Sequence, residues 1–178
     1  MKYWIETYTG KRFDYEHIEL NKIDIRDIAH ALSNTCRFNG HCSEFYSVAE
    51  HSVNVAIAIS QCKHMLPALL HDATEAYMPD VSKPLKGYWN TFFKLEEFEA
   101  KMSDHIYRQL GVPIDDEIWR QIKLYDYAML RRERDILFKD KQLWEFPEDI
   151  PVTNLEIHKW SPQVAEKMFL KLYNLINT

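Results

Sequence analysis

Apolar residues recur at helical spacing in almost every segment after Asp24, and this pattern constrains the fold more than any other feature. Residues 24–33 begin with Asp24, a residue typical of a helix N-cap, and carry an apolar stripe on one face. Residues 47–60 begin with Ser47, and Glu50 follows three residues later, which predicts a capping box. Both segments are therefore predicted to be amphipathic helices.

Helices are also predicted in the rest of the chain, where prolines and glycines mark their ends. They cover residues 67–79, 91–110 and 115–138, and a last one begins at 161. Pro84 and Gly87 predict a loop, and residues 139–160 are expected to be irregular. Residues 3–13 have β-branched and aromatic residues on both sides of a Thr-Gly pair, which predicts a short N-terminal β-hairpin. The expected fold class is all-α with this one hairpin.

Length and composition are those of one folded domain. A chain of 178 residues fits one domain better than two. Its 46% apolar and 28% charged residues are ordinary for a globular protein, and only 4 glycines argue against a loop-rich chain. We expect a single domain over residues 1–178.

Charge, cysteine content and hydropathy exclude several classes of function. The formal net charge of −5 excludes a broad basic surface for a nucleic-acid polymer. No signal-peptide core and no apolar run of about 18 residues occur, so a secreted or membrane-spanning protein is not expected. Cys36, Cys42 and Cys62 are odd in number and form no CxxC pair, which argues against a disulfide framework and a zinc ribbon. We therefore expect the protein to be located in a reducing cytoplasm.

The stretch LLHDATEAYMPD, residues 69–80, places His71 and Asp72 directly after two leucines. Burying such groups without partners would cost on the order of several kcal/mol each, so something must compensate them. Imidazole and carboxylate are natural ligands of borderline and hard divalent ions. A stable site needs ligands from other helices, and the best candidates are His51 and Asp126, the latter an acid among apolar residues. The sequence therefore predicts a metal site.

The order His51, His71-Asp72, Asp126 resembles the H…HD…D pattern of the HD-domain metal-dependent phosphohydrolases. The local sequences AEHS, HDATEAYMPD and KPLK resemble the bacterial 5'-deoxynucleotidase branch and small phage HD-domain proteins, which include dATP triphosphohydrolases. The resemblance implies an HD-domain helical bundle, one divalent metal ion (Mn, Co, Zn or Mg) and a homo-oligomer, either a dimer or a hexamer. The interval between His51 and His71 is short for a deoxynucleotidase, which implies a trimmed connection between their helices.

The resemblance also implies roles for residues that are not ligands. Glu75, on the predicted helix face of His71, and Asp80 match catalytic and substrate-orienting positions. Glu75 would orient a water molecule or carry its proton. An arginine in the TCRFNGH segment matches a phosphate-binding position, and its planar fork suits phosphate oxygens. The candidate substrate- and phosphate-binding residues are Arg37, His41, Lys83 and Lys86.

The function expected from this resemblance is hydrolysis of deoxynucleoside 5'-monophosphates to nucleoside and phosphate. The alternative is a dNTP triphosphohydrolase that releases triphosphate from a substrate such as dATP. A third possibility is a nucleotide-binding module without turnover. The expected partner is a deoxynucleotide, with neither a nucleic-acid polymer nor a membrane.

Several candidate residues also have a purely structural alternative. Arg37 could pair on the surface with Glu44 or Glu50. Asp126 could form a half-buried salt bridge to Arg131 or Arg132. The run RRERD, residues 131–135, is otherwise predicted to be a solvated helix face with internal ion pairs. His41 could equally have a structural role. The aromatic residues that could stack on a base or pack in the core are Phe38, Tyr46, Tyr77 and Trp89.

Overall fold

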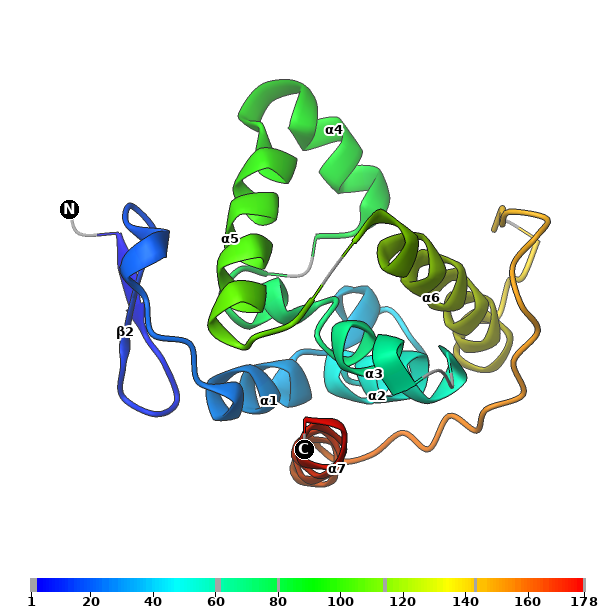
Figure 1. Cartoon of the computed structure of the whole chain (residues 1–178). Helices are drawn as coiled ribbons and strands as arrows, with labels where there is room; N and C mark the ends of the chain where they lie inside the picture. Colours follow the sequence, from blue (N-terminus) through cyan, green and yellow to red (C-terminus); the bar gives the residue numbers. More distant parts are fainter. Residues whose placement is uncertain (1–2, 60–61, 80, 114, 143, 178) are drawn as a thin grey trace.

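A computed structural model describes residues 3–59, 62–79, 81–113, 115–142 and 144–177 (Figure 1). These residues form seven α-helices, three short 3₁₀ helices and one two-stranded antiparallel sheet, which confirms a mainly helical fold with a hairpin. No helix in these ranges combines the length and apolar character needed to cross a bilayer. The α-helices are α1 (Ile25–Asn34), α2 (Val48–Ile59), α3 (Cys62–Leu69), α4 (Lys83–Phe93), α5 (Leu95–Gln109), α6 (Asp116–Leu137) and α7 (Pro162–Ile176). The 3₁₀ helices are η1 (Ile18–Leu20), η2 (Arg37–Gly40) and η3 (Ala73–Ala76).

The N-terminal hairpin forms where the sequence predicts it. Strand β1 (Trp4–Glu6) pairs with β2 (Arg12–Asp14), and Ile5 lies opposite Phe13. Gly10 adopts a φ of 77° in the connecting turn, a conformation that glycine reaches without strain. Phe13 is 2% exposed and joins the hairpin to the main core.

Three helices begin at the residues whose side chains cap them. Asp24 accepts a hydrogen bond from the N–H of Arg26 at the start of α1, and Ser161 accepts one from Val164 at the start of α7. Asp115 caps α6 in the same way. These caps satisfy amide groups that a helix leaves without a partner in its first turn, which is why the predicted helix starts are confirmed.

The predicted helix over residues 67–79 is wrong, because α3 ends at Leu69 and η3 begins only at Ala73. The cause lies in the turn between them. His71 Nδ1 lies 2.7 Å from the carbonyl oxygen of Ala68, which a continued α-helix would offer to the N–H of Asp72. Glu75 therefore does not share a helix face with His71.

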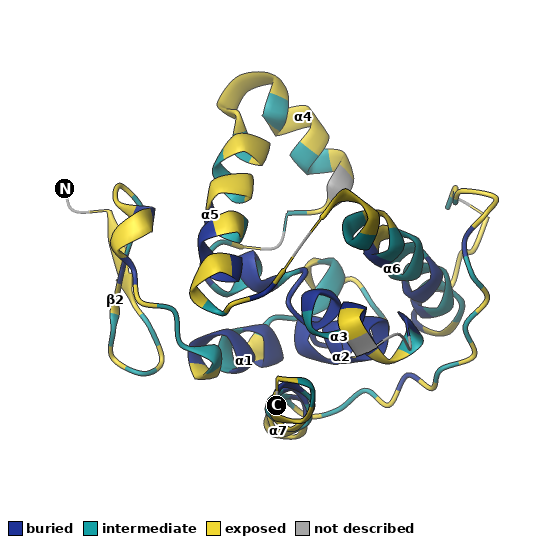
Figure 2. Cartoon of the chain, viewed as in Figure 1, coloured by how far each residue is buried: buried dark blue, intermediate teal, exposed yellow. Residues whose placement is uncertain are grey.

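The loop predicted at Pro84 and Gly87 is also wrong, because both residues lie inside α4. Pro84 occupies the first turn, where its missing N–H would have no helical partner anyway. The helix ends instead at Lys94, whose φ of 47° separates α4 from α5. These two helices project from the rest of the molecule and are exposed over much of their surface (Figure 2).

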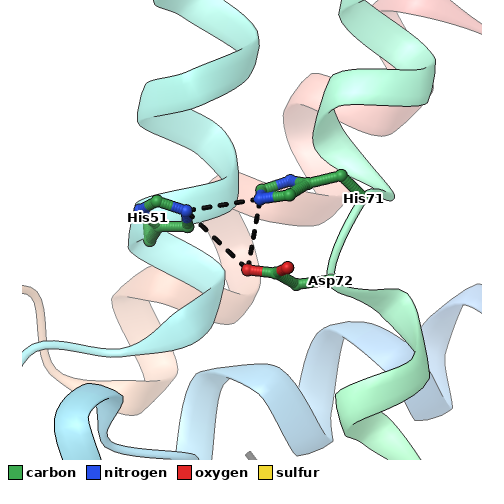
Figure 3. Close-up of side chains that lie close together, drawn as sticks. All are labelled: His51, His71 and Asp72. Carbon is green, nitrogen blue, oxygen red and sulfur yellow. Dashed lines mark hydrogen bonds and ion pairs between the residues drawn. The ribbon is translucent and has the colours of Figure 1, made fainter. Parts of the chain in front are cut away.

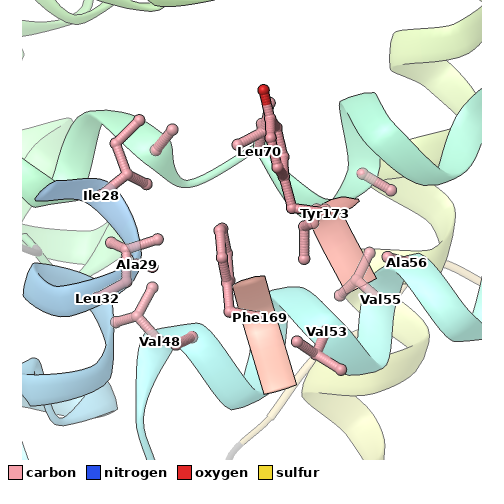
Figure 4. Packing of buried hydrophobic residues seen from close by; sticks show 14 of the residues in the cluster. Ile28, Ala29, Leu32, Val48, Val53, Val55, Ala56, Leu70, Phe169 and Tyr173 are labelled. Atoms are coloured by element: carbon pink, nitrogen blue, oxygen red, sulfur yellow. The ribbon is translucent and has the colours of Figure 1, made fainter. Parts of the chain in front are cut away.

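Helix α2 lies at the centre of the fold and packs against α1, α3, α6 and α7. Almost all of its surface is buried (Figure 2). Phe169 of α7 is fully buried beside Leu32 of α1 and Val48 and Val53 of α2 (Figure 4). Burial of a side chain this large contributes about 1.5–3 kcal/mol. A histidine on α2 is consequently held in a rigid, largely dry setting.

The connection between α6 and α7 runs along the edge of the molecule (Figure 1) and is anchored to α2 by Glu50. Ser47 accepts a hydrogen bond from the Glu50 N–H, as a capping box requires. The Glu50 carboxylate does not return to Ser47. It accepts hydrogen bonds from the backbone N–H groups of His158, Lys159 and Trp160, so the predicted box is only half formed.

Candidate metal centre

Three side chains converge between α2 and the turn that follows α3 (Figure 3). The Nε2 atoms of His51 and His71 lie 3.3 Å apart. One oxygen of Asp72, Oδ2, lies 3.2 Å from His71 Nε2 and 3.7 Å from His51 Nε2. The candidate ligand atoms of these three residues all lie within 4.8 Å of one another, so the group could hold a metal ion.

Helix α6 adds a carboxylate to this cluster. Asp126 Oδ1 lies 3.2 Å from His51 Nε2 and 4.0 Å from His71 Nε2. The structure thus brings together all four residues that the sequence predicts as ligands. Arg131 and Arg132, the alternative partners of Asp126, donate to backbone carbonyls in the connection between α6 and α7.

The two histidines are oriented by acceptors on their Nδ1 atoms. His71 Nδ1 lies 2.7 Å from the Ala68 carbonyl oxygen, and His51 Nδ1 lies 2.6 Å from Oε1 of Glu133. Because a carbonyl or a carboxylate can only accept, both Nδ1 atoms carry the hydrogen. A ring held in this way directs its Nε2 atom at the cluster, and once that nitrogen carries no proton its lone pair is available to a cation. Two such nitrogens beside two carboxylates are a donor set suited to a divalent cation.

Glu133 is a component of the site that the sequence analysis missed. Its side chain is fully buried, and Oε1 also accepts a hydrogen bond from the Tyr46 hydroxyl at 2.9 Å. The prediction that residues 131–135 form a solvated face is wrong for this residue. Glu133 follows Asp126 by two helical turns, so the two acids lie on one face of α6. That spacing was the signal that could have found it.

Arg37 lies against the cluster and not on the surface. Its side chain is 11% exposed, with Nη1 at 3.5 Å from Asp72 Oδ2 and Nη2 at 3.3 Å from Glu133 Oε2. The alternative partners are engaged elsewhere, since Glu44 pairs with a lysine and Glu50 accepts backbone N–H groups. Arg37 is therefore held by two carboxylates, one of which is a candidate ligand.

The loop that begins with Arg37 has an unusual backbone. Phe38, Asn39 and Gly40 have φ values of 56°, 52° and 77°, so three successive residues are left-handed. For residues other than glycine this conformation costs on the order of 1–3 kcal/mol and persists where the surroundings impose it, often at functional sites. His41 ends this loop with an exposed side chain, and its contact with phosphate stays a prediction.

Lys86 reaches toward the cluster from α4 but is paired with α5. Its Nζ lies 2.9 and 2.8 Å from the two carboxylate oxygens of Glu99. Burial lowers the pKa of Lys86, but Glu99, Glu75 and Asp72 together raise it. Lys86 is therefore a fixed positive charge within electrostatic reach of the candidate site.

The remaining predicted residues are placed less completely. Glu75 is half-buried in η3, on the chain segment that directly follows Asp72. Lys83 begins α4, and its side chain lies outside the described part of the structure. Asp80 also lies outside the described residues. The catalytic roles of Glu75 and Asp80 stay predictions.

The histidines and carboxylates of the cluster shift one another's pKa values. Burial opposes protonation of His51, yet Glu133 and Asp126 raise its pKa to about 9. For the two candidate carboxylate ligands burial acts in the opposite direction and raises the pKa. The nearby histidines nevertheless hold the pKa of Asp72 and of Asp126 below the usual range. The carboxylates are ionised at neutral pH and favour a cation between them.

The four aromatic candidates divide between the core and the surface. Tyr46 and Tyr77 are buried in the core, and Phe38 packs edge-on against Phe138. Trp89 is 39% exposed on α4. Tyr46 and Tyr77 therefore lie in the core, as their structural alternative predicts, and the hydroxyl of Tyr46 reaches Glu133.

Comparison with known proteins finds relatives along nearly the whole chain. No model of a protein family matches it. It is 38% identical over 173 residues to a protein of Escherichia coli (strain K12) named "Uncharacterized protein YfdR", a match that covers 96% of this chain and 94% of that protein. It is 27% identical over 188 residues to "Uncharacterized protein RCAP_rcc00048" of Rhodobacter capsulatus, covering 97% and 95%. The similarity thus extends over the whole fold and is not confined to one motif.

Proposed function

The chain belongs to the same family as YfdR, and we propose that it is an HD-domain, metal-dependent phosphohydrolase acting on a deoxynucleoside 5'-monophosphate. The observation that carries the proposal is the convergence of His51, His71, Asp72 and Asp126 beside the guanidinium of Arg37. A cluster able to hold a divalent ion, next to a nearly buried cation, is an arrangement suited to the hydrolysis of a phosphate ester.

The donor set fits one divalent metal ion, with Mn, Co, Zn and Mg as the candidates. Both Nε2 atoms and an oxygen of each aspartate face the same small volume. When bound there, such an ion polarises a phosphate oxygen and lowers the pKa of water. The imidazole rings enter already oriented by Ala68 and Glu133, so little reorganisation opposes binding.

Arg37 would bind the phosphate group of the substrate. Its contacts with Asp72 and Glu133 are ion pairs of 3.5 and 3.3 Å. Within the described residues its Nε has no hydrogen-bond partner, although the atom is buried. A guanidinium that still has N–H donors without a partner can donate hydrogen bonds to two phosphate oxygens at once. These bonds orient the phosphate group and offset its negative charge.

Glu75 would accept the proton of the attacking water. It follows Asp72 closely in the chain, and its charge contributes to the raised pKa of Lys86. A carboxylate at hydrogen-bond distance from a nucleophilic water is a competent general base. Asp80 would orient the substrate or share in this proton transfer. Lys86 would offset part of the negative charge of Glu75 and Asp72.

Charge matching favours a monophosphate over a triphosphate. Besides the candidate histidine ligands, Arg37 and Lys86 are two described cations that interact electrostatically with Asp72. Two cations beside a divalent ion suit a dianionic monophosphate, whereas a triphosphate carries about twice that charge. From the family resemblance we also propose that the protein is a homo-oligomer, either a dimer or a hexamer, and that it is located in the cytoplasm.

The test is a panel of deoxynucleoside mono-, di- and triphosphates with Mn²⁺, Co²⁺, Mg²⁺ or Zn²⁺. Inorganic phosphate, pyrophosphate and triphosphate are measured separately. Phosphate release from monophosphates supports the proposal. Triphosphate release from dATP identifies a triphosphohydrolase instead, and binding without any product identifies a nucleotide-binding module.

A further inference from the structure

Glu133 contacts a candidate metal ligand and the candidate phosphate-binding arginine at the same time. We propose that Glu133 is a positioning residue that fixes His51 for the metal and holds Arg37 beside it. The inference rests on the metal and phosphate sites of the proposed function. Glu133 would couple the metal site to the phosphate site, because both metal binding and phosphate binding would depend on this one buried carboxylate.

The first half of the coupling concerns His51. Glu133 Oε1 lies 2.6 Å from His51 Nδ1, and both side chains are fully buried. A carboxylate there keeps the hydrogen on Nδ1, sets the angle of the ring and makes Nε2 a stronger donor to a cation. The Tyr46 hydroxyl binds the same oxygen at 2.9 Å and restrains it further.

The second half concerns Arg37. Glu133 Oε2, 3.3 Å from Arg37 Nη2, is buried and has no hydrogen-bond partner in the described part of the chain. Arg37 also pairs with Asp72, but a cation bound by Asp72 would neutralise part of the negative charge of that carboxylate and so weaken its attraction for Arg37. Glu133 would then be the anion that keeps the guanidinium in place.

Packing does not explain a carboxylate at this position. Glu133 lies at 0% exposure on a helix face that also buries Met129 and Leu137. An apolar side chain of similar size would fill the same space without the desolvation of a charge. The retained charge is directed at two side chains of the candidate site, which points to a role in organising that site.

The matched comparison is Glu133→Gln against Glu50→Gln. Both replace a fully buried glutamate by its amide, but Glu50 is bonded to the backbone of residues 158–160. Calorimetry measures Co²⁺ or Mn²⁺ binding, and then inorganic phosphate binding to the metal-loaded protein. We expect Glu133→Gln to weaken metal binding roughly 10- to 100-fold and phosphate binding about tenfold or more. We expect Glu50→Gln to lower Tm and leave both affinities unchanged.

A second comparison tests the coupling to Arg37. In the double variant Glu133→Gln with Arg37→Lys, the losses in phosphate affinity should be less than additive, because both changes affect one guanidinium. Fully additive losses overturn this half of the proposal. Wild-type affinities in Glu133→Gln, with a lowered Tm alone, overturn it entirely and make Glu133 a structural residue.

The inference can be tested even if Glu133→Gln does not fold, and its test is independent of the proposed function. If Glu133→Gln does not fold, Glu133→Asp keeps the charge but shortens its reach, and unchanged metal affinity in that variant overturns the proposal. None of these measurements uses nucleotide turnover. A protein that shows the expected affinity losses but hydrolyses no nucleotide therefore retains the role of Glu133 and loses the phosphohydrolase assignment.

Discussion

Replacing Glu50 by glutamine removes the anchor of the connection between α6 and α7. Glu50 Oε1 accepts the N–H groups of His158 at 2.7 Å and Lys159 at 2.9 Å, and Oε2 accepts that of Trp160 at 2.6 Å. Glutamine keeps one oxygen and puts an NH₂ group in place of the other. At least one backbone N–H then faces a donor at this partly buried contact, whichever way the amide is turned.

The expected loss of stability follows from these contacts. One charge-assisted hydrogen bond contributes about 1.5–3 kcal/mol, and a buried N–H left without an acceptor costs about 1–3 kcal/mol. Burial raises the pKa of Glu50 in spite of the three N–H groups, so a neutral side chain is partly favoured there. We therefore expect a net loss of about 2–3 kcal/mol. For a chain of this length that corresponds to a Tm lower by roughly 4–12 °C.

Thermal unfolding of the metal-free protein, followed by circular dichroism, measures this loss without a contribution from bound metal. Glu156→Gln is the control, since that side chain is 79% exposed in the same connection, and its expected effect is within about 0.5 kcal/mol. A Tm of Glu50→Gln equal to that of the control would refute the reasoning. It would mean that the backbone of residues 158–160 finds other acceptors.

Four further predictions concern the candidate site. Asp72→Ala should lose bound metal and activity together, and full metal occupancy by elemental analysis would rule Asp72 out as a ligand. Arg37→Lys keeps the charge without the planar fork and should lower kcat/KM by about 10- to 100-fold with little change in Tm; unchanged kinetics would contradict it. Glu75→Gln should retain metal and bind nucleotide but lose roughly 10²- to 10⁴-fold in kcat, and normal turnover would exclude Glu75 as the base. Because the pKa of His51 is raised to about 9, its proton is present below that pH and must leave when metal binds. Metal affinity should therefore rise with pH up to about 9, with proton release detectable by calorimetry in different buffers, and pH-independent affinity would contradict this.

Helix starts could be predicted because they depend on local chemistry. Asp24 and Ser161 cap the helices that follow them, and a cap involves groups only two or three residues away. The end of α3 could not be predicted in the same way. It depends on the side chain of His71 taking the Ala68 carbonyl, and helical periodicity carries no information about that choice.

Asp126 and the His71-Asp72 pair could be predicted because each is polar in an apolar setting, where burial requires a partner that the helix itself does not supply. His51 directly follows Glu50, and it was indicated by the H…HD…D order of the family resemblance. The distances between them could not be derived from spacing. They depend on how α2, α3 and α6 pack, which is a property of the whole core.

Glu133 was missed for a physical reason that applies to charged runs in general. Its neighbours in the chain are arginines, and a run of charges suggests a solvated face. A helix, however, turns by about 100° per residue, so adjacent residues point in different directions. The relevant neighbours of Glu133 are Met129 and Asp126, one and two turns earlier, and Met129 is fully buried. Once Asp126 is taken as a ligand, the same rotation places Glu133 on the inner face of α6, where a carboxylate needs cationic or hydrogen-bonding partners, and His51 and Arg37 supply them.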